Sequence, residues 1–274
     1  MRTWLFVPGH DARKSAKALQ SAADVIIFDW EDAVPEDRKA EARQTVRATL
    51  LAADRPTPRR VVRINHAGHP GFVEDVAALE GLPISGVMLP KVAGPDDVRR
   101  LAAHTPHPII PLLESARGIE SALHIAEAHA QVERLAYGAL DFVADLGGQW
   151  TPSGEASHYA RARIAVAGRA AGLAGPVDSV YPLLDDAEGL RRDAVAARVL
   201  GFAGKTLLHP NQIAIALEVF APTADEIREA TTVLTAFAEA RARGESVVRL
   251  PDGRFVDPPV VRWAEQVLGP DRHL

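Results

Sequence analysis

Short apolar runs alternate with longer stretches of helical spacing through the first 210 residues of this chain. The runs are rich in Val, Ile and Leu and are continuous rather than alternating, which is typical of strands buried on both faces of a parallel sheet. They occupy residues 3–7, 25–30, 60–65, 86–91, 109–114, 134–141, 177–181 and 205–209. This pattern predicts eight parallel strands.

The stretches between these runs predict helices at residues 12–22, 39–51, 95–103, 121–128, 155–171 and 185–200. Asp11 is suited to capping the first of them, and Pro95 stands in the first turn of the third. Alternating strands and helices favour an α/β fold with right-handed crossovers. Eight such units of roughly 25 residues are typical of a (β/α)8 TIM barrel. A doubly wound open sheet is disfavoured, because no Gly-x-Gly-x-x-Gly motif follows the first strand.

The segment after residue 222 does not continue this alternation. A long helix is predicted at residues 223–243, followed by a small hairpin formed by residues 246–250 and 254–256 around Pro251-Asp252-Gly253. Asp257-Pro258-Pro259 begins a last helix that runs to Leu268. We therefore expect a barrel catalytic domain over residues 1–222 and a C-terminal helix–hairpin–helix extension over residues 223–274, acting as a lid or in oligomerisation.

The composition excludes several classes of function. The chain has 31 Lys and Arg against 36 Asp and Glu, a formal net charge of −5, so it offers no basic surface for nucleic acid. No apolar run approaches the roughly 20 residues that span a membrane, and the N-terminus lacks the features of a signal peptide. Cys is absent, which excludes thiolate nucleophiles, disulfides and Cys-ligated zinc. These features predict a cytoplasmic protein without membrane partners.

Polar residues end most of the predicted strands. In a (β/α)8 barrel the carboxyl ends of the strands meet at one mouth, where active sites lie. Carboxylates gathered there repel one another unless a cation lies among them. Arg63 and Lys91 supply part of that positive charge, and a hard divalent cation such as Mg²⁺ would supply the rest. The strand-end groups are Asp29-Trp30-Glu31-Asp32, Arg63-Ile64-Asn65, Pro90-Lys91, Glu114-Ser115, Asp141 with Asp145, and His209-Pro210-Asn211-Gln212.

These motifs in series resemble the citrate lyase β-subunit-like branch of the HpcH/HpaI aldolase family. The resemblance covers essentially the whole chain and is specific for the family rather than for the substrate. It is carried by Arg2-Thr3-Trp4-Leu5-Phe6-Val7-Pro8-Gly9, Asp29 through Pro35, Val62 through Asn65, Leu89-Pro90-Lys91, Leu113-Glu114-Ser115, Asp141 through Gly147, Gly204-Lys205, His209 through Gln212 and Asp257-Pro258.

The resemblance implies roles for individual residues at the mouth. Glu114 and Asp141 match the two direct Mg²⁺ ligands of the family. Glu31 and Asp32 match acids that hold metal-bound waters or shape their surroundings, and Asp145 is grouped with these two. Arg63 matches the arginine that grips the keto-acid carboxylate.

Further roles concern the acid/base group and coenzyme A (CoA). Asp257 matches a general acid/base that the lid of a neighbouring subunit delivers, although an Asp before Pro-Pro is also an excellent helix cap. For Lys91 we favour electrostatic or structural duty over a Schiff base, and we group it with Arg63 among the substrate-binding residues. His209 is expected at the rim or in packing. The CoA-binding segment would comprise Pro8, Gly9, His10, Arg13, Lys14 and Lys17, the last three of which could equally form a solvated helix face.

The resemblance implies a Mg²⁺-dependent carbon–carbon lyase. The substrate would be a 3-hydroxyacyl-CoA dicarboxylate, such as malyl-CoA or citramalyl-CoA, cleaved to an acyl-CoA and a 2-keto acid. The alternatives are a citrate lyase β-subunit that uses an acyl-carrier protein, and an aldolase that cleaves a free hydroxy-keto acid. A catalytically silent scaffold on the same fold is a further alternative. It would be expected to have lost at least one of Arg63, Glu114 and Asp141, and all three are present. A homo-oligomer, a trimer or a hexamer, is a further expectation of the resemblance.

One position departs from the usual sequence motif of the family. Trp30 replaces the customary Leu in Asp-Leu-Glu-Asp. Strand alternation should point this side chain away from the mouth, so we expect altered packing rather than altered chemistry.

Overall fold

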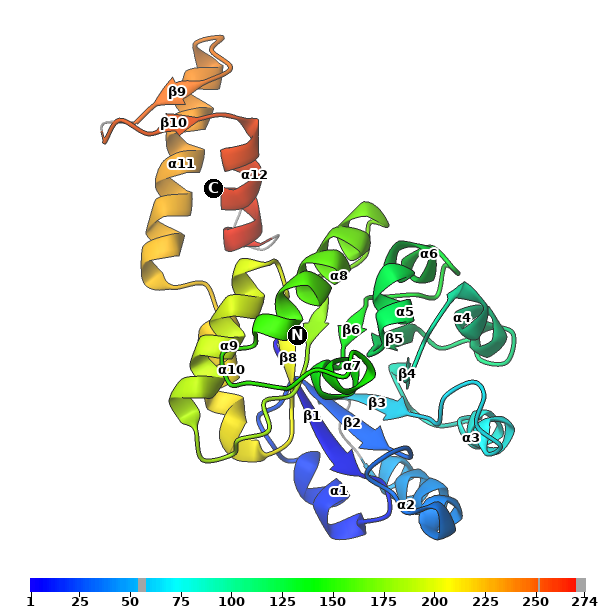
Figure 1. Cartoon of the computed structure of the whole chain (residues 1–274). Coiled ribbons are helices and arrows are strands. Elements are labelled where there is room, and N and C mark those ends of the chain that lie inside the picture. Colours follow the sequence, from blue (N-terminus) through cyan, green and yellow to red (C-terminus); the bar gives the residue numbers. More distant parts are fainter. Residues whose placement is uncertain (54–57, 251, 270–274) are drawn as a thin grey trace. The chain divides into compact units, whose positions relative to one another are not determined.

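Eight parallel strands close into a barrel in chain order in the computed structural model, with β8 hydrogen-bonded to β1 (Figure 1). The structure describes residues 1–53, 58–250 and 252–269. The strands are β1 (Thr3–Pro8), β2 (Val25–Asp29), β3 (Arg59–Arg63), β4 (Gly86–Leu89), β5 (Ile109–Leu113), β6 (Ala136–Tyr137), β7 (Val177–Asp178) and β8 (Gly204–Leu207). The predicted (β/α)8 fold is confirmed.

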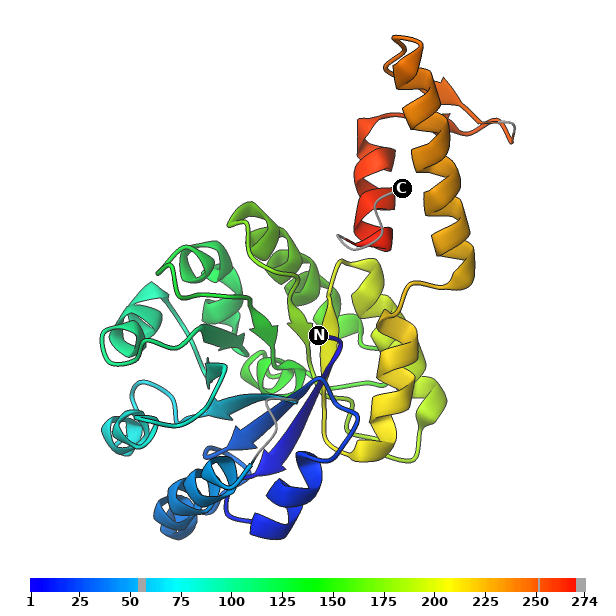
Figure 2. The same cartoon turned by 180° about the vertical axis from the view of Figure 1, so that it is seen from behind.

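Helices surround the strands (Figures 1 and 2). They are α1 (Ala12–Ala18), α2 (Lys39–Leu51), α3 (Phe72–Ala78), α4 (Pro95–Ala102), α5 (Ala116–Glu120), α6 (Ala122–Ala126), α7 (Ala139–Asp145), α8 (His158–Ala170), α9 (Ala187–Val199) and α10 (Ile213–Phe220), with 3₁₀ turns η1 (Glu36–Arg38), η2 (Glu155–Ser157) and η3 (Pro210–Gln212). The cap predicted for the first helix is confirmed, because the Asp11 side chain accepts a hydrogen bond from the Lys14 amide.

The sixth predicted strand is wrong in its second half. Only Ala136–Tyr137 pair as a strand, and Asp141 lies in the first turn of α7. Gly138 ends the extended segment, after which Ala139, Phe142 and Val143 recur at helical spacing and are the buried residues of α7. Asp141 therefore reaches the mouth from a helix and not from a strand end.

Strand alternation separates two apolar layers. Val25 and Ile27 of β2 pack inside the barrel with Trp4, whereas Ile26 and Phe28 pack outward against the helices. The next inward position after Ile27 is Asp29. Polar side chains therefore begin where the apolar filling of the barrel ends, and this sets the place of the functional site.

Residues Ala221–Leu274 form a second compact unit, separate from the unit Met1–Phe220. It consists of α11 (Ala224–Ala242), β9 (Val248–Arg249), β10 (Phe255–Val256) and α12 (Pro258–Leu268), which is the predicted helix–hairpin–helix order. It has a small apolar core of its own. In the hairpin turn Gly253 takes a positive φ of 90°, and Pro251 lies outside the described residues. Within the described part of the chain, no helix is both long and apolar enough to cross a membrane.

Candidate active site

Asp29 and Arg63 form a buried ion pair at the ends of neighbouring strands. They occupy paired positions in the β2–β3 register and point into the barrel. Arg63 Nε and Nη2 lie 2.7 and 2.5 Å from the two oxygens of Asp29, a bidentate arrangement. The guanidinium stacks over Phe6, 4.7 Å from the ring centroid. Although burial opposes it, the charge of Asp29 raises the pKa of Arg63, which stays a cation.

Asp29 also organises the loop after β2. It accepts hydrogen bonds from the amides of Glu31 and Ala33, at 2.9 and 3.1 Å. With two donors from Arg63 and two from the backbone, both carboxylate oxygens are fully engaged. Asp29 therefore holds the site together and is not free to bind a ligand.

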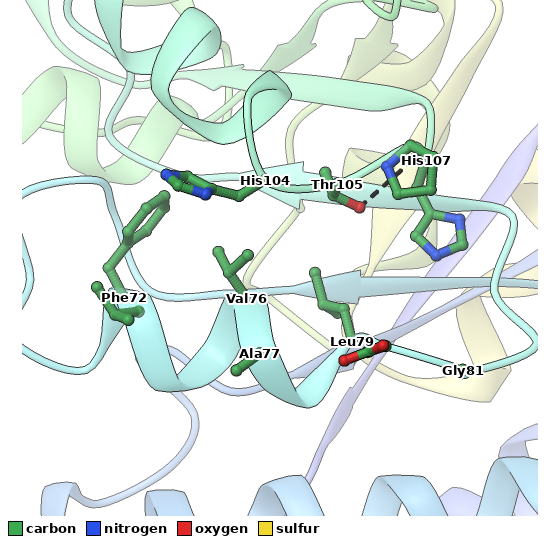
Figure 3. A pocket seen from close by; sticks show the side chains of 11 residues that line it. Phe72, Val76, Ala77, Leu79, Gly81, His104, Thr105 and His107 are labelled. Carbon is green, nitrogen blue, oxygen red and sulfur yellow. Dashed lines mark hydrogen bonds between the residues drawn. The ribbon is translucent and has the colours of Figure 1, made fainter.

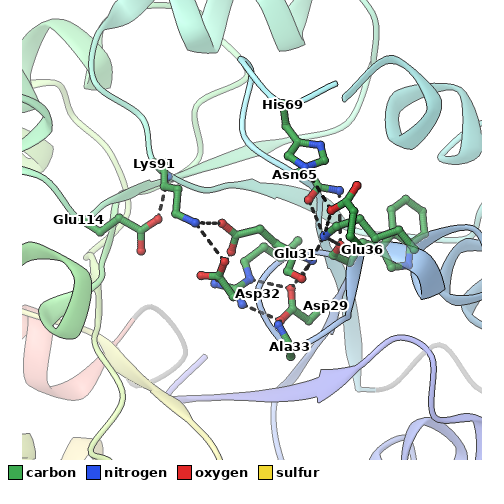
Figure 4. A network of polar contacts seen from close by, with 12 residues as sticks. Asp29, Glu31, Asp32, Ala33, Glu36, Asn65, His69, Lys91 and Glu114 are labelled. Carbon is green, nitrogen blue, oxygen red and sulfur yellow. Dashed lines mark hydrogen bonds and ion pairs between the residues drawn. The ribbon is translucent and has the colours of Figure 1, made fainter. Parts of the chain in front are cut away.

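Lys91 links Glu31 and Asp32 to the opposite side of the mouth (Figure 4). Its Nζ lies 2.5 Å from Glu31 Oε1 and 3.0 Å from Asp32 Oδ1, and Glu31 Oε2 lies 2.9 Å from Arg63 Nη1. Burial raises the pKa of Glu31, whereas Lys91 lowers the pKa of the more exposed Asp32 against the effect of burial. The two acids raise the pKa of Lys91 although its burial opposes them, which keeps it an ammonium and unsuited to forming a Schiff base.

The backbone of Lys91 is also unusual. It has a φ of 53°, the left-handed region that non-glycine residues rarely adopt. This conformation directs the Lys91 amide to Glu114 Oε1 at 2.7 Å while the side chain reaches Glu31 and Asp32. One residue thus connects the acids at the end of β2 with the acid at the end of β5.

Glu114 is the most strongly perturbed carboxyl group at the mouth. It follows β5, is 4% exposed, and has its pKa raised to about 8 by burial and by the charges of Asp141 and Glu31. Gly138 makes room for it, because a Cβ at residue 138 would lie 2.5 Å from Glu114 Oε2. A buried acid with raised pKa beside a second acid is a group whose ionised form a cation would stabilise.

Helix α7 brings Asp141 close to this acid and Asp145 to the start of α5. The Asp141 side chain is exposed at the first turn. The helix is tied at both ends, since Ser179 Oγ accepts from the Ala139 amide at 2.8 Å and Asp145 accepts from the Ala116 amide at 2.7 Å. Asp145 therefore joins the end of α7 to the start of α5, two residues after Glu114.

No group of three or more His, Asp or Glu side chains placed to hold a metal ion occurs in residues 1–53, 58–250 and 252–269. Glu114 and Asp141 offer carboxylate oxygens from two elements, at a place where a buried acid needs a positive charge. This donor set fits Mg²⁺, which is commonly held by one or two carboxylates and fills its remaining positions with water and substrate oxygens.

The predicted CoA-binding residues lie beside a separate pocket of about 800 Å³ between β1, α1 and α10. Pro8, Lys14 and Lys17 line it, together with His209 from the end of β8. Gly9 stands next to it and brings β1 close to β2: its amide donates to Asp29 O, and a Cβ there would lie 2.6 Å from that oxygen. Arg13 is exposed on α1, and His10 is partly buried after β1.

His209 is exposed at the rim, as expected, and it caps η3 by accepting from the Asn211 amide. The expectation that the Trp30 side chain points away from the mouth is also confirmed, because it is fully buried in the outer layer with Phe28. Its indole packs against Gly9, at the place where a Cβ on that residue would collide with it.

Asp257 caps α12 in the C-terminal unit. Its side chain accepts from the Val260 amide at 3.3 Å, which agrees with the capping interpretation of Asp before Pro-Pro. The residue is partly exposed, and the capping bond engages one carboxylate oxygen. An acid/base role for Asp257 stays a prediction.

Another pocket, of about 570 Å³, lies between α3 and the segment that leads to β5 (Figure 3). Its walls are largely apolar, with Phe72, Val76 and Leu79 on one side and Thr105 with two histidines on the other. Glu80 also lines it, but the described lining contains no Lys or Arg, so the pocket does not fit the predicted chemistry.

Sequence reasoning missed two residues that shape the site. Asp29 was named as a strand-end group without a role, although its register with Arg63 at two adjacent strand ends is a signal for the pair. Lys39 was not singled out at all. It stands in phase with Ala42, Val46 and Leu50 on the buried face of α2, and a lysine within an apolar stripe is a signal of a buried polar contact.

The chain matches the family model of HpcH/HpaI aldolase/citrate lyase over residues 2–210. A (3S)-malyl-CoA thioesterase of Cereibacter sphaeroides is 38% identical over 268 residues, which cover 97% of this chain and 93% of that protein. The mitochondrial citramalyl-CoA lyase of Rattus norvegicus is 32% identical over 289 residues, covering 97% of this chain and 85% of that protein.

A solved structure extends the similarity to three dimensions. The crystal structure of CitE from Mycobacterium tuberculosis in complex with magnesium, acetoacetate and coenzyme A superposes with a TM-score of 0.84 at 34% identity, and covers 97% of this chain and 96% of that one. The sequence match, the relatives and the shared barrel agree: this chain belongs to the HpcH/HpaI aldolase/citrate lyase family.

Proposed function

We propose that this protein is a Mg²⁺-dependent carbon–carbon lyase that cleaves a 3-hydroxyacyl-CoA dicarboxylate, such as malyl-CoA or citramalyl-CoA, into an acyl-CoA and a 2-keto acid. The observation that carries the proposal is the buried Glu114 beside Asp141, facing Arg63 across the mouth. The similarity to a citramalyl-CoA lyase and to a structure with bound magnesium and coenzyme A supports it.

Glu114 and Asp141 would hold the cation. Bound Mg²⁺ would supply Lewis-acid polarisation of the oxygen next to the carbon–carbon bond that breaks. Arg63 would bind the keto-acid carboxylate. Three of its five N–H donors contact Asp29 and Glu31 in the described residues, which leaves two for a ligand carboxylate. Lys91 keeps Glu31 in place and adds a second positive charge to the same wall.

In cleavage, the substrate hydroxyl gives its proton to a water molecule at the mouth, and its carbon–oxygen bond becomes the carbonyl of the 2-keto acid. The carbon–carbon bond breaks at the same time, and its electron pair passes to the acyl-CoA as an enolate. That enolate takes a proton at carbon to give the acyl-CoA. We assign the donation of this proton to Asp257. The C-terminal unit would act as a lid that brings Asp257 to the mouth of a neighbouring subunit in a homo-oligomer, a trimer or a hexamer. Pro8, Gly9, His10, Arg13, Lys14 and Lys17 would contact the CoA moiety at the β1–α1 pocket.

The test is a panel of acyl-CoA and keto-acid pairs assayed for condensation with Mg²⁺ and with EDTA. The pairs join acetyl-CoA or propionyl-CoA to glyoxylate, pyruvate or oxaloacetate. Magnesium-dependent product with at least one pair, lost in Glu114→Gln, is the expected result. Absence of product with every pair, or product that survives EDTA, would overturn the proposed lyase activity.

A second candidate function is hydrolysis of the same class of thioester. The similarity to a (3S)-malyl-CoA thioesterase at 38% identity over nearly the whole chain favours it. Hydrolysis adds water across the acyl–sulfur bond and yields a dicarboxylic acid and free CoA. Because the chain has no Cys, attack would come from water activated at the mouth rather than from a protein thiolate.

Product analysis separates the two functions. With malyl-CoA as substrate, a lyase yields glyoxylate and acetyl-CoA, whereas a thioesterase yields malate and free CoA. A thiol reagent detects only free CoA in this assay, since the protein contributes no Cys. Glyoxylate without thiol supports the lyase, thiol without glyoxylate supports the thioesterase, and both together indicate lyase and hydrolase activity in one protein.

A further inference from the structure

A buried lysine lies behind the loop that carries Glu31. Lys39 is the first residue of α2, and its side chain is 9% exposed on the helix face that buries Ala42, Val46 and Leu50. Lysine is almost never fully buried unless its ammonium is paired, because an unsatisfied charge in the interior costs several kcal/mol. The contacts of Lys39 therefore indicate what it holds.

All three N–H donors of Lys39 are directed at residues that directly follow β2 and β3. Nζ donates to the backbone oxygens of Trp30 at 2.9 Å and Glu31 at 3.2 Å, and to Asn65 Oδ1 at 2.8 Å. A lysine has three donors, so none is left over. The nearest ion-pair contact is the largely exposed Glu36, at 3.8 Å. Lys39 is thus held chiefly by carbonyl oxygens and not by a buried carboxylate.

Asn65 extends this contact into the barrel wall. Its side-chain amide donates to Asp75 Oδ2 at 2.6 Å, and its backbone amide donates to the same oxygen at 2.8 Å. Asp75 is fully buried and accepts from Arg43 Nη1 at 2.6 Å through its other oxygen. A continuous chain of hydrogen bonds therefore joins α2 and α3 to the end of β2.

The loop after β2 is consequently held from two sides. On the barrel side, Asp29 accepts the amides of Glu31 and Ala33. On the helix side, Lys39 binds the carbonyl oxygens of Trp30 and Glu31. These two sets of contacts fix the peptide units on either side of Glu31. They therefore also fix the direction of the Glu31 carboxylate, which points towards Arg63 and Lys91.

We infer that Lys39 is a positioning residue for the reaction: it fixes the Trp30–Glu31 backbone so that Glu31 keeps Arg63 and Lys91 oriented to receive the keto-acid carboxylate. This role rests on the proposed function for its kinetic consequence, but the anchoring of the loop does not depend on it. Lys39 contacts no reacting atom in this proposal.

The experiment compares wild type with Lys39→Met, which removes the three donors and keeps a long apolar side chain. Hydrogen–deuterium exchange of residues 29–35, recorded without substrate, should be at least tenfold faster in the variant. The KM for the keto acid should rise while the KM for the acyl-CoA stays unchanged, with a loss of roughly ten- to a hundredfold in kcat/KM. A loss of folded protein alone would lower kcat and leave both KM values unchanged.

The matched control is Arg47→Met, two turns further along α2. This substitution removes a hydrogen bond from the Arg47 side chain to the backbone oxygen of Glu80. It should leave loop exchange and both KM values at wild-type levels. Lys39→Gln, with a shorter polar side chain, should show the same effects at smaller size and serves if Lys39→Met does not fold.

Unchanged exchange of residues 29–35 in both Lys39 variants would overturn the anchoring. Faster exchange with both KM values unchanged would overturn the positioning role. A wild-type protein without lyase or thioesterase turnover would overturn the proposed function instead, and loop exchange without substrate would still decide whether Lys39 anchors the loop.

Discussion

At the scale of a single residue, Glu114 determines how the stability of the barrel should change with pH. Its pKa of about 8 lies far above the ordinary value of 4.5. Between these two values the folded state keeps a proton that the unfolded chain has released. The folded state therefore binds more protons in this window, and its stability falls as the pH rises.

We predict that the free energy of unfolding in EDTA decreases from pH 5 to pH 8 by up to about 1.4 kcal/mol per pH unit from this group. Glu114→Gln, which cannot ionise, should reduce that slope, and saturating Mg²⁺ should reduce it in the wild type. Urea denaturation at pH 5, 6, 7 and 8 measures the slopes. Equal slopes for wild type and variant would contradict the raised pKa.

Gly138 gives a second prediction at this scale. A Cβ at this position would collide with Glu114, so Gly138→Ala should displace the carboxylate and weaken Mg²⁺ binding by roughly ten- to a hundredfold. Calorimetric titration of Mg²⁺ measures the change. Gly168→Ala is the control, because a Cβ at that helical position meets no heavy atom within 4 Å. Equal affinity in both variants would show that Glu114 does not need this space.

At the scale of the elements, the barrel was predicted well from the sequence, but the elements that carry the residues of its mouth were predicted less well. Continuous apolar runs identify buried strands, and this was enough to predict all eight. Asp141 was placed on a strand because residues 136, 137 and 140 continue an apolar run. Only the spacing of Phe142 and Val143 from Ala139, three and four residues, indicates the helix.

Besides α7, three helices were not predicted, for different physical reasons. α3 buries Asp75 together with Phe72, so its buried face is partly polar and its period is hard to see. α10 is apolar almost all round and has no polar face to define a period. α5 has only five residues. Side-chain partnerships such as Lys39 with the oxygens of Trp30 and Glu31 depend on three-dimensional proximity, which the periodicity of the sequence does not encode.

A buried charge network joins β7 and β8 to α8 and α9 and gives the prediction at this scale. Lys205 Nζ lies 2.6 Å from Asp178 and 2.5 Å from Asp193, and Arg161 contacts the same two acids. Lys205→Met leaves two acids with one cation in the interior. Such a change should cost about 3–5 kcal/mol of unfolding free energy.

Chemical denaturation measures this cost against a control on α9, the helix that carries Asp193. Arg191→Met breaks an exposed ion pair with Glu218 and should cost less than about 1 kcal/mol. If Lys205→Met cost no more than Arg191→Met, the network would be dispensable for folding. Mg²⁺ binding by the folded fraction should be unchanged in both variants, since neither residue lies at the mouth.

At the scale of the whole molecule, the barrel and the C-terminal unit have separate cores. We predict that Asp257→Ala keeps Mg²⁺ and keto-acid binding but lowers kcat by roughly 10²- to 10⁴-fold, as expected for removal of a general acid/base. Binding by calorimetry and turnover in the condensation assay measure the two effects. Turnover at the wild-type rate would leave Asp257 with its capping role alone.

Subunit mixing tests whether the lid acts on a neighbouring subunit. Arg63→Ala and Asp257→Ala proteins, each expected to retain only a small residual activity alone, are unfolded and refolded together. If Asp257 serves the mouth of a partner, some mixed oligomers contain one intact mouth and activity partly returns. If it serves its own chain, the mixture stays as inactive as its parts.

The balance of charge at the mouth has a consequence for the order of events. The cations at the mouth are Arg63 and Lys91, and the acids are Asp29, Glu31, Asp32, Glu114 and Asp141. The ionised acids therefore outnumber the cations even while Glu114 keeps its proton. An anionic keto acid approaching this surface is repelled until a divalent cation has entered. Binding should therefore be sequential, cation first and acid second, and by linkage each should tighten the other by the same factor. Calorimetric titration of pyruvate with and without Mg²⁺, and of Mg²⁺ with and without pyruvate, measures both factors.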